Sequence, residues 1–171
     1  MALIVEDGTG KVDAESYNSV AEVSTTLAKT GEDAAWLALA SDTIREQVAR
    51  KATRRMDTES RYRGDKKTQA QALEWPRDDA VDDDGWAYDS TSLPSSLKVA
   101  HAQFCAAGAV SGADLQPTQT APGTIKSKSI GVGPISKSVT YEGGLSPEVF
   151  YRKAESLLAE LVEPAGVLER A

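Results

Sequence analysis

The chain has 171 residues, a formal net charge of −7 at pH 7, and only 6% aromatic residues. This length suits one domain with its own core, and an alanine-rich, aromatic-poor composition favours closely packed helices over a large β-sandwich. The longest purely apolar run, residues 34–40, is far shorter than the roughly 20 residues that span a bilayer, so we expect no membrane segment. A single cysteine, Cys105, excludes a disulfide framework and suits a cytosolic or intracellularly assembled product.

Charge is segregated along the chain. Residues 43–77 carry 10 basic and 5 acidic side chains, whereas residues 78–93 carry 6 acidic side chains and no basic one. Blocks of opposite sign suit pairing between copies of one subunit, and ordinary solvated faces explain them equally well.

Two helices are expected in the first third of the chain. The first begins at Ser19, which forms a capping box with Glu22, and ends near Gly31. A short apolar turn at residues 36–39 precedes the second helix, which begins at Thr43 with Glu46 as a second capping box. Its apolar stripe would consist of Ile44, Val48, Ala52 and Met56. Its other side would present a basic face of Arg45, Arg50, Lys51, Arg54 and Arg55.

Residues 58–92 lack sustained periodicity and are rich in turn formers, which predicts a long loop packed by its own side chains. The side chains expected to pack it are Tyr62, Leu73, Trp75, Trp86 and Tyr88. Within the stretch "QALEWPR", we expect Leu73 and Trp75 to turn inward as anchors, with Pro76 setting the exit direction. The alternative is that the indole is displayed for a partner. Arg77 is expected at the surface, paired with nearby aspartates.

A third helix should follow Pro94, with an apolar side of Leu97, Ala100, Phe104 and Ala107. After a flexible connector, residues 124–142 read as two short strands or an extended hairpin arm. A last helix begins at Ser146 and Pro147, with a buried stripe of Phe150, Ala154, Leu157, Leu158 and Leu161. The sequence therefore predicts a mainly α fold: a small bundle of about four helices in one domain, residues 1–171. Its helical core would span about 15–112 and 146–162, and its tail residues 163–171.

No catalytic constellation is found. His101 and Cys105 lie four residues apart, which gives too few ligands for a metal and favours a satisfied buried pair. The run of aspartates before Gly85 matches a calcium loop poorly, although a weak divalent site stays open. The basic segment, with Tyr62 interleaved, could contact nucleic acid, but the acidic overall charge opposes it. We therefore expect no enzyme activity, no metal and no cofactor.

Several motifs occur in a familiar order: "EDGTG", "YRGDKKTQAQALEWPR", "LPSSLKVAHAQFCAAG" and "SPEVFYRKAESLLAELV". This order resembles the small tailed-phage proteins labelled DnaT-like single-stranded-DNA-binding proteins, which we interpret as head-tail connector (adaptor, or head-completion) subunits. The resemblance implies a virion neck protein that forms a twelvefold ring below the portal and prolongs the DNA channel. Its partners would be the portal protein, the next neck or tail-completion protein, and DNA that passes without specific binding. The alternative is a single-stranded-DNA-binding accessory protein of phage replication.

Two sets of contact residues follow from this interpretation. The subunit-interface candidates are Arg45, Arg50, Arg54, Arg55, Asp82, Asp83 and Asp84. The portal or neck contact candidates are Ile130, Ile135, Pro164, Val167 and Leu168.

Overall fold

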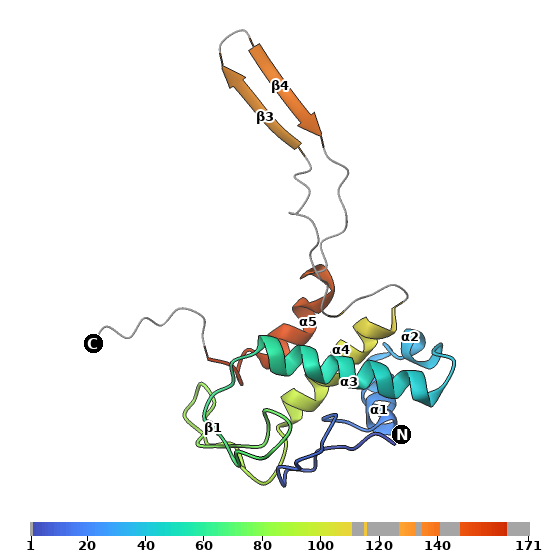
Figure 1. Cartoon of the computed structure of the whole chain (residues 1–171), viewed down its shortest axis with the longest axis vertical. Helices are drawn as coiled ribbons and strands as arrows, with labels where there is room; N and C mark the ends of the chain where they lie inside the picture. Colours follow the sequence, from blue (N-terminus) through green and yellow to red (C-terminus); the bar gives the residue numbers. More distant parts are fainter. Residues whose placement is uncertain (1, 111–114, 116–126, 133–134, 141–147, 164–171) are drawn as a thin grey trace, which may run out of the picture.

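The computed structural model describes residues 2–110, 115, 127–132, 135–140 and 148–163. Its helices are α1 (Val20–Thr30), α2 (Ala34–Leu37), α3 (Asp42–Glu59), α4 (Ser95–Ala109) and α5 (Glu148–Leu158), as Figure 1 shows. Its strands are β1 (Asp65–Lys66), β2 (Arg77–Asp78), β3 (Ser127–Val132) and β4 (Ile135–Thr140). The mainly helical fold with an antiparallel hairpin is the one that the sequence predicts. In the described part of the chain, no helix combines the length and apolar character needed to cross a bilayer.

Local capping explains where the first helices begin and end. Ser19 and Glu22 form both hydrogen bonds of the capping box of α1, and Gly31 closes the helix in the left-handed conformation. The predicted start of α3 is wrong by one residue and its cap by two. The helix begins at Asp42, and Ser41 is its N-cap, accepting a hydrogen bond from the backbone N–H of Ile44.

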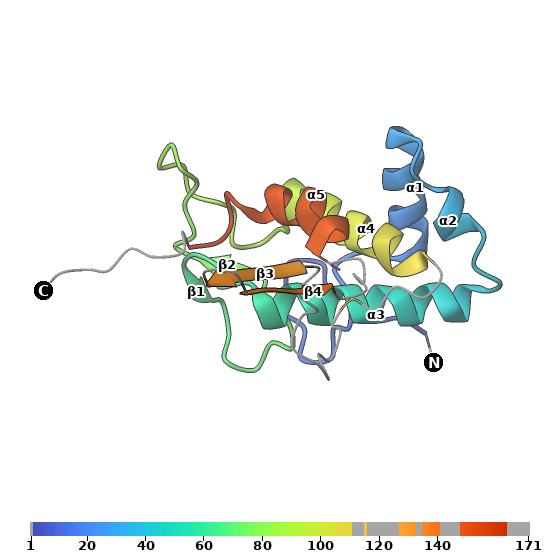
Figure 2. The same ribbon diagram turned by 90° about the horizontal axis from the view of Figure 1, so that it is seen from above.

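Helix α4 is the centre of the fold. It packs against α1, α2, α3 and α5, and Figure 2 shows it lying between α5 and α3. Ala100, Ala102 and Cys105 are all fully buried, although they project from different sides of this helix. A helix that is buried nearly all round needs small side chains, because neighbouring backbones must approach it closely.

The buried side of α3 differs from the predicted stripe. Val48, Ala52 and Met56 lie in the core as expected, but Ile44 is 37% exposed. Ala49 and Thr53 are buried instead. The buried face therefore broadens toward the i+1 positions, where His101 of α4 contacts Ala49 and Thr53.

Helix α5 completes the bundle. Ala154, Leu158 and Leu161 of its predicted stripe are buried, and Leu157 is partly buried. Phe150 lies on the helix, but its side chain is outside the described part of the structure, as are Ser146 and Pro147. Beyond the helix, Val162 forms an antiparallel bridge with Tyr62.

The N-terminal segment folds around one buried carboxylate. Glu6 is only 2% exposed, and its two oxygens accept hydrogen bonds from the backbone N–H groups of Asp7, Gly8, Gly10 and Lys11. Four amide donors replace the water that the carboxylate loses on burial. This arrangement explains the "EDGTG" motif as a structural loop.

The hairpin of β3 and β4 pairs Ser127 with Thr140 and Val132 with Ile135. Figure 1 shows it extending away from the helices along the long axis of the picture. Ile130 and Ile135 lie on its strands, so their assignment to portal or neck contacts stays a prediction. Pro164, Val167 and Leu168 lie outside the described residues.

Gly64 offers a test of how tightly the loop after α3 is packed. It adopts φ +71°, and a Cβ atom there would lie 2.3 Å from the backbone oxygen of Asp78. Gly31 has nearly the same φ, +69°, with nothing within 4 Å of the corresponding position. We expect Gly31→Ala to cost about 1–2 kcal/mol of unfolding free energy from the left-handed conformation alone.

Gly64→Ala should cost clearly more than Gly31→Ala, because the β1–β2 pair must separate to relieve the clash. Chemical denaturation of the two variants measures the difference. Equal losses in both variants would show that the loop does not hold Gly64 against Asp78.

Candidate functional site

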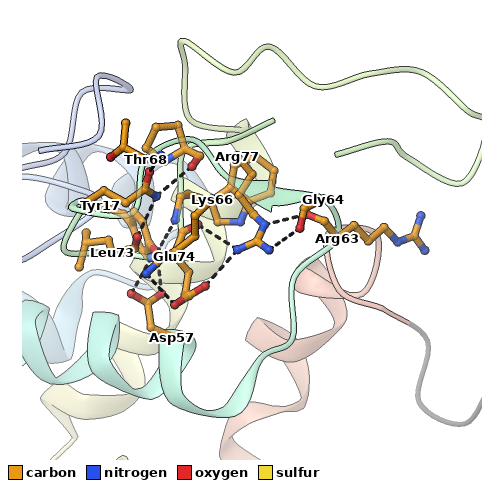
Figure 3. Close-up of polar contacts among 12 residues, drawn as sticks. Tyr17, Asp57, Arg63, Gly64, Lys66, Thr68, Leu73, Glu74 and Arg77 are labelled. Atoms are coloured by element: carbon orange, nitrogen blue, oxygen red, sulfur yellow. Dashed lines mark hydrogen bonds and ion pairs between the residues drawn. The ribbon is translucent and has the colours of Figure 1, made fainter. Parts of the chain in front are cut away.

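The stretch "QALEWPR" forms the most densely bonded part of the loop (Figure 3). Trp75 is fully buried and makes edge-to-face contacts with Tyr62 and Tyr88, at centroid distances of 6.1 and 5.9 Å. Leu73 is 7% exposed and Pro76 is buried, and the Trp75–Pro76 peptide bond is cis. These residues point into the core, as the sequence interpretation of an inward anchor expects.

Gln71 holds the backbone of this stretch in place. Its side-chain Nε2 donates to the backbone oxygens of Leu73 and Pro76, each at 2.9 Å, and its Oε1 accepts from the backbone N–H of Thr68. The side chain is buried, so these bonds replace all of its contacts with water. A single amide thus fixes a segment that has no regular structure.

Arg77 is buried, not exposed as predicted. Its guanidinium donates to the backbone oxygens of Arg63 and Gly64, and it forms an ion pair with Glu74 at 3.0 Å. The sequence favoured an exposed pair because aspartates follow directly. The structure turns the side chain back toward the preceding loop, where carbonyl oxygens supply a geometry that a planar guanidinium satisfies.

Asp57, at the end of α3, links this loop to the helices. Its Oδ1 accepts from the Tyr17 hydroxyl at 2.6 Å, and its Oδ2 accepts from the backbone N–H of Glu74 at 3.2 Å (Figure 3). Burial raises the pKa of Asp57 to about 6, and these two hydrogen bonds oppose the rise. The sequence analysis missed this residue, because its partners are 17 and 40 positions away.

Asp57 borders a surface pocket of about 370 Å³ that also includes Arg50, Arg54 and Leu73. A carboxyl group with a raised pKa beside a pocket is a common feature of catalytic acids. Here both of its oxygens already accept hydrogen bonds from the protein. The arrangement therefore acts chemically as a clamp between α3, the N-terminal segment and the loop.

Most of the predicted basic face of α3 is paired within the chain. Arg45 donates to the backbone oxygens of Trp36, Leu37 and Leu39 and pairs with Asp42, so it caps the short helix α2. Such a guanidinium is not available to a neighbour without unfolding that turn.

The other arginines of α3 differ from one another. Arg50 pairs with Glu15 and Glu46, and Arg55 pairs with Glu59 and Glu155. Within the described part of the structure, Arg54 and Lys51 have no ion-pair partner, and both are exposed. The helix therefore presents two cations that are unpaired with described residues, where the sequence suggested five, and the interface role of these arginines stays a prediction.

The three aspartates of the acidic segment also have different surroundings. The Asp82 carboxylate accepts from the backbone N–H groups of Asp84 and Trp86, and Asp83 pairs with Arg63. Among the described residues, the Asp84 carboxylate has no partner. Their role at a subunit interface likewise stays a prediction.

Trp86 lies beside these aspartates and is 75% exposed. The prediction that it packs the loop is therefore wrong. The Asp82 turn carries the indole outward on a short hairpin, and the core position near Tyr88 is filled by Trp75. An aspartate followed three residues later by glycine is a turn signal that could have placed Trp86 at a tip.

His101 and Cys105 form part of a buried polar cluster. His101 Nε2 lies 3.2 Å from the Ala49 backbone oxygen and 3.0 Å from Thr53 Oγ1, and its Nδ1 lies 3.2 Å from the Asn18 amide nitrogen. Burial lowers the pKa of His101 to about 4, so the ring is neutral. Among the described residues no group of three or more metal-binding side chains occurs. The cluster joins α3, α4 and the segment before α1.

Comparison with known proteins gives one match. A family model described as "Putative DnaT-like ssDNA binding protein" matches residues 1–170. No curated protein and no solved structure matches the chain.

The loop has one buried tryptophan, Trp75, and one exposed tryptophan, Trp86, and their alanine variants form a matched pair. Trp75→Ala should lower the free energy of unfolding by about 3–5 kcal/mol, because a fully buried ring between two tyrosines is lost. Trp86→Ala should leave it nearly unchanged, because the side chain is mostly in water. Thermal melting of the isolated chain distinguishes them, and similar melting curves for both variants would contradict the anchor role of Trp75.

The pKa of Asp57 predicts a pH-dependent difference between the wild type and Asp57→Asn. The carboxyl group titrates near 3.8 when unfolded and near 6 when folded, so the folded state binds the proton more tightly. Its contribution to stability is therefore complete below pH 3.8 and is lost as pH rises through 6. Tyr17, Glu74 and Lys66 are the titratable neighbours.

Asparagine does not titrate, so the stability of Asp57→Asn relative to wild type should increase by about 2–3 kcal/mol between pH 4 and pH 7. Urea unfolding of both proteins across this range measures it. A difference that does not vary with pH would show that Asp57 is not held in a desolvated site.

Proposed function

We propose that this chain, which belongs to the DnaT-like ssDNA binding protein family, works as an assembly subunit that binds other proteins, namely as the head-tail connector of a tailed phage. The observation that carries the proposal is the distribution of charged and aromatic side chains. The basic side chains are mostly engaged by carboxylates and carbonyl oxygens of the same chain, and the most exposed tryptophan stands among aspartates.

This surface suits protein contacts better than contacts with a phosphate backbone. Proteins that bind single strands combine a continuous positive groove with aromatic rings on which bases stack. Here Tyr62, the aromatic side chain of the basic segment, is 3% exposed and packs against Trp75. The exposed Trp86 lies between Asp84 and Asp89, where phosphates would be repelled.

The connector role itself rests on the order of the sequence motifs, and two structural features support it. The hairpin of β3 and β4 extends from the helical body, as an arm that contacts a neighbouring protein would. The acidic net charge would let DNA pass through a channel without binding to its wall. In a contact between the basic face of α3 and the acidic segment, Lys51 and Arg54 would be the basic side chains that have no ion-pair partner among the described residues.

The second candidate function is single-stranded DNA binding, which the description of the matching family favours. The same two side chains, Lys51 and Arg54, are the exposed cations of α3 that are not paired with described residues, so they are where a phosphate would bind.

One pair of measurements separates the two functions. We expect electron microscopy of the chain mixed with its portal protein to reveal a ring on the portal. We expect a fluorescein-labelled oligothymidine to bind no more tightly than the roughly 10⁻⁴–10⁻⁶ M typical of nonspecific association at physiological salt.

Tighter binding of the oligonucleotide, abolished by Lys51→Ala with Arg54→Ala, would establish the second function. Micrographs that show the portal protein with no added density would contradict the connector function. The double variant should melt normally, because neither side chain is paired with a described residue, so a loss of binding would not reflect unfolding.

A further inference from the structure

A short hairpin at residues 81–87 carries the most exposed large apolar side chain of the described structure. Val81 and Ala87 form an antiparallel bridge, and the backbone N–H of Asp82 donates to the oxygen of Trp86 at 2.9 Å. Trp86 is 75% exposed and Val81 40% exposed. Isolated exposed leucines or valines are ordinary, but an exposed tryptophan is unusual and is the side chain most enriched among interface hot spots.

Hydrogen bonds hold the hairpin at its turn and at its base. The Asp82 carboxylate binds two backbone N–H groups of the turn, and Gly85 adopts φ +86° at its tip. Arg63 fixes the base, since its guanidinium donates to the backbone oxygens of Val81 and Val162 and pairs with Asp83. A side chain presented by a preorganised turn loses little conformational freedom when it binds.

A pocket of about 260 Å³ lies elsewhere on the body, between α2, α4 and α5. Its apolar wall consists of Ala35, Ala106, Ala107, Val110 and Ala154. Its polar rim consists of Glu32, Gln103 and Lys153. The small side chains of this wall leave a hollow that can take a planar ring.

The rim of this pocket complements the tip of the hairpin in charge and hydrogen bonding. The Lys153 side chain is 60% exposed although it pairs with Glu32, so its ammonium can donate to a second carboxylate. On the hairpin, Asp84 is exposed and has no partner among the described residues. The Glu32 carboxylate already accepts hydrogen bonds from Lys153, Gln103 and Thr30, so it holds the ammonium of Lys153 at this rim.

The hairpin and helix α2, which forms one side of the pocket, lie at opposite ends of the body. Figures 1 and 2 both show the loop between β2 and α4 at the left end and α2 at the right end. A projection at one end that fits a hollow at the other joins identical molecules head to tail. Such a contact closes into a ring when the rotation between neighbours allows it.

We propose that Trp86 of one copy of this chain docks in the pocket between α2, α4 and α5 of a second copy, with Asp84 facing Lys153. The contact rests on the proposed assembly function and names its interface. It replaces the contact expected from the sequence, because the acidic segment meets α5 and not the largely paired face of α3.

The fluorescence of the native protein tests the contact directly. The chain has three tryptophans, and Trp36 and Trp75 are fully buried, so acrylamide reports on Trp86. We expect the fraction of emission that acrylamide quenches to fall as protein concentration rises, in parallel with self-association measured by sedimentation. A chain that stays monomeric at every concentration overturns the proposal.

Three variants identify the two surfaces. Trp86→Ala should raise the dissociation constant for self-association about 30-fold or more, as removal of a hot-spot side chain does. Ala107→Leu fills the pocket from its wall and should weaken association while leaving Trp86 open to acrylamide at all concentrations. Val12→Ala, at a residue that is 69% exposed and far from the hairpin in sequence, is the matched control and should associate as wild type does.

The outcomes also separate this proposal from the proposed function. Self-association that persists in Trp86→Ala overturns the docking contact and leaves an assembly function in place. If the portal protein shields Trp86 from acrylamide and a second copy of this chain does not, the docking contact between copies is overturned, and Trp86 contacts the portal protein. A ring absent from the portal, together with tight oligonucleotide binding, removes the assembly function itself.

Discussion

Burial of Trp75 is the interaction on which the shape of this molecule depends. The loop between α3 and α4 contains only two-residue strands, so backbone pairing cannot order it. The indole, enclosed by Tyr62 and Tyr88, supplies the apolar burial that offsets the entropy of fixing so many residues. Because Tyr88 follows the 81–87 hairpin directly, the same contact determines where that hairpin leaves the body.

Internal pairing of charges shapes the surface as much as packing shapes the core. The sequence places ten basic side chains between residues 43 and 77, which suggests a positive surface. In the fold, Arg45 caps α2, Arg63 holds the 81–87 hairpin and Arg77 closes the loop. Each uses a guanidinium as a multiple donor to carbonyl oxygens, a role that lysine could not fill. These cations stabilise the fold from within the chain, and the net charge of the molecule is negative.

Local patterns predicted the fold well, and long-range contacts limited what else could be predicted. The caps of α1 depend on residues three positions apart, so Ser19 and Glu22 were identifiable from the sequence. The burial of Arg77 depends on carbonyl oxygens of residues 63 and 64, and the raised pKa of Asp57 depends first on its burial and then on the hydrogen bond from Tyr17, which opposes the rise. The exposure of Trp86 depends on Trp75 filling the site beside Tyr88. None of these three features leaves a periodic signal in the sequence.

The two polar clusters of the interior make the helix arrangement specific. A core of alanine, leucine and valine tolerates small rotations of its helices, because apolar contacts have little directionality. His101 and Asp57 remove that freedom, since their hydrogen bonds to Ala49, Thr53 and Tyr17 exist in one register only. The docking proposed for Trp86 needs this constraint, because a rotation of α4 would move Ala106 and Ala107 relative to Ala35 and Ala154 on the other sides of the pocket.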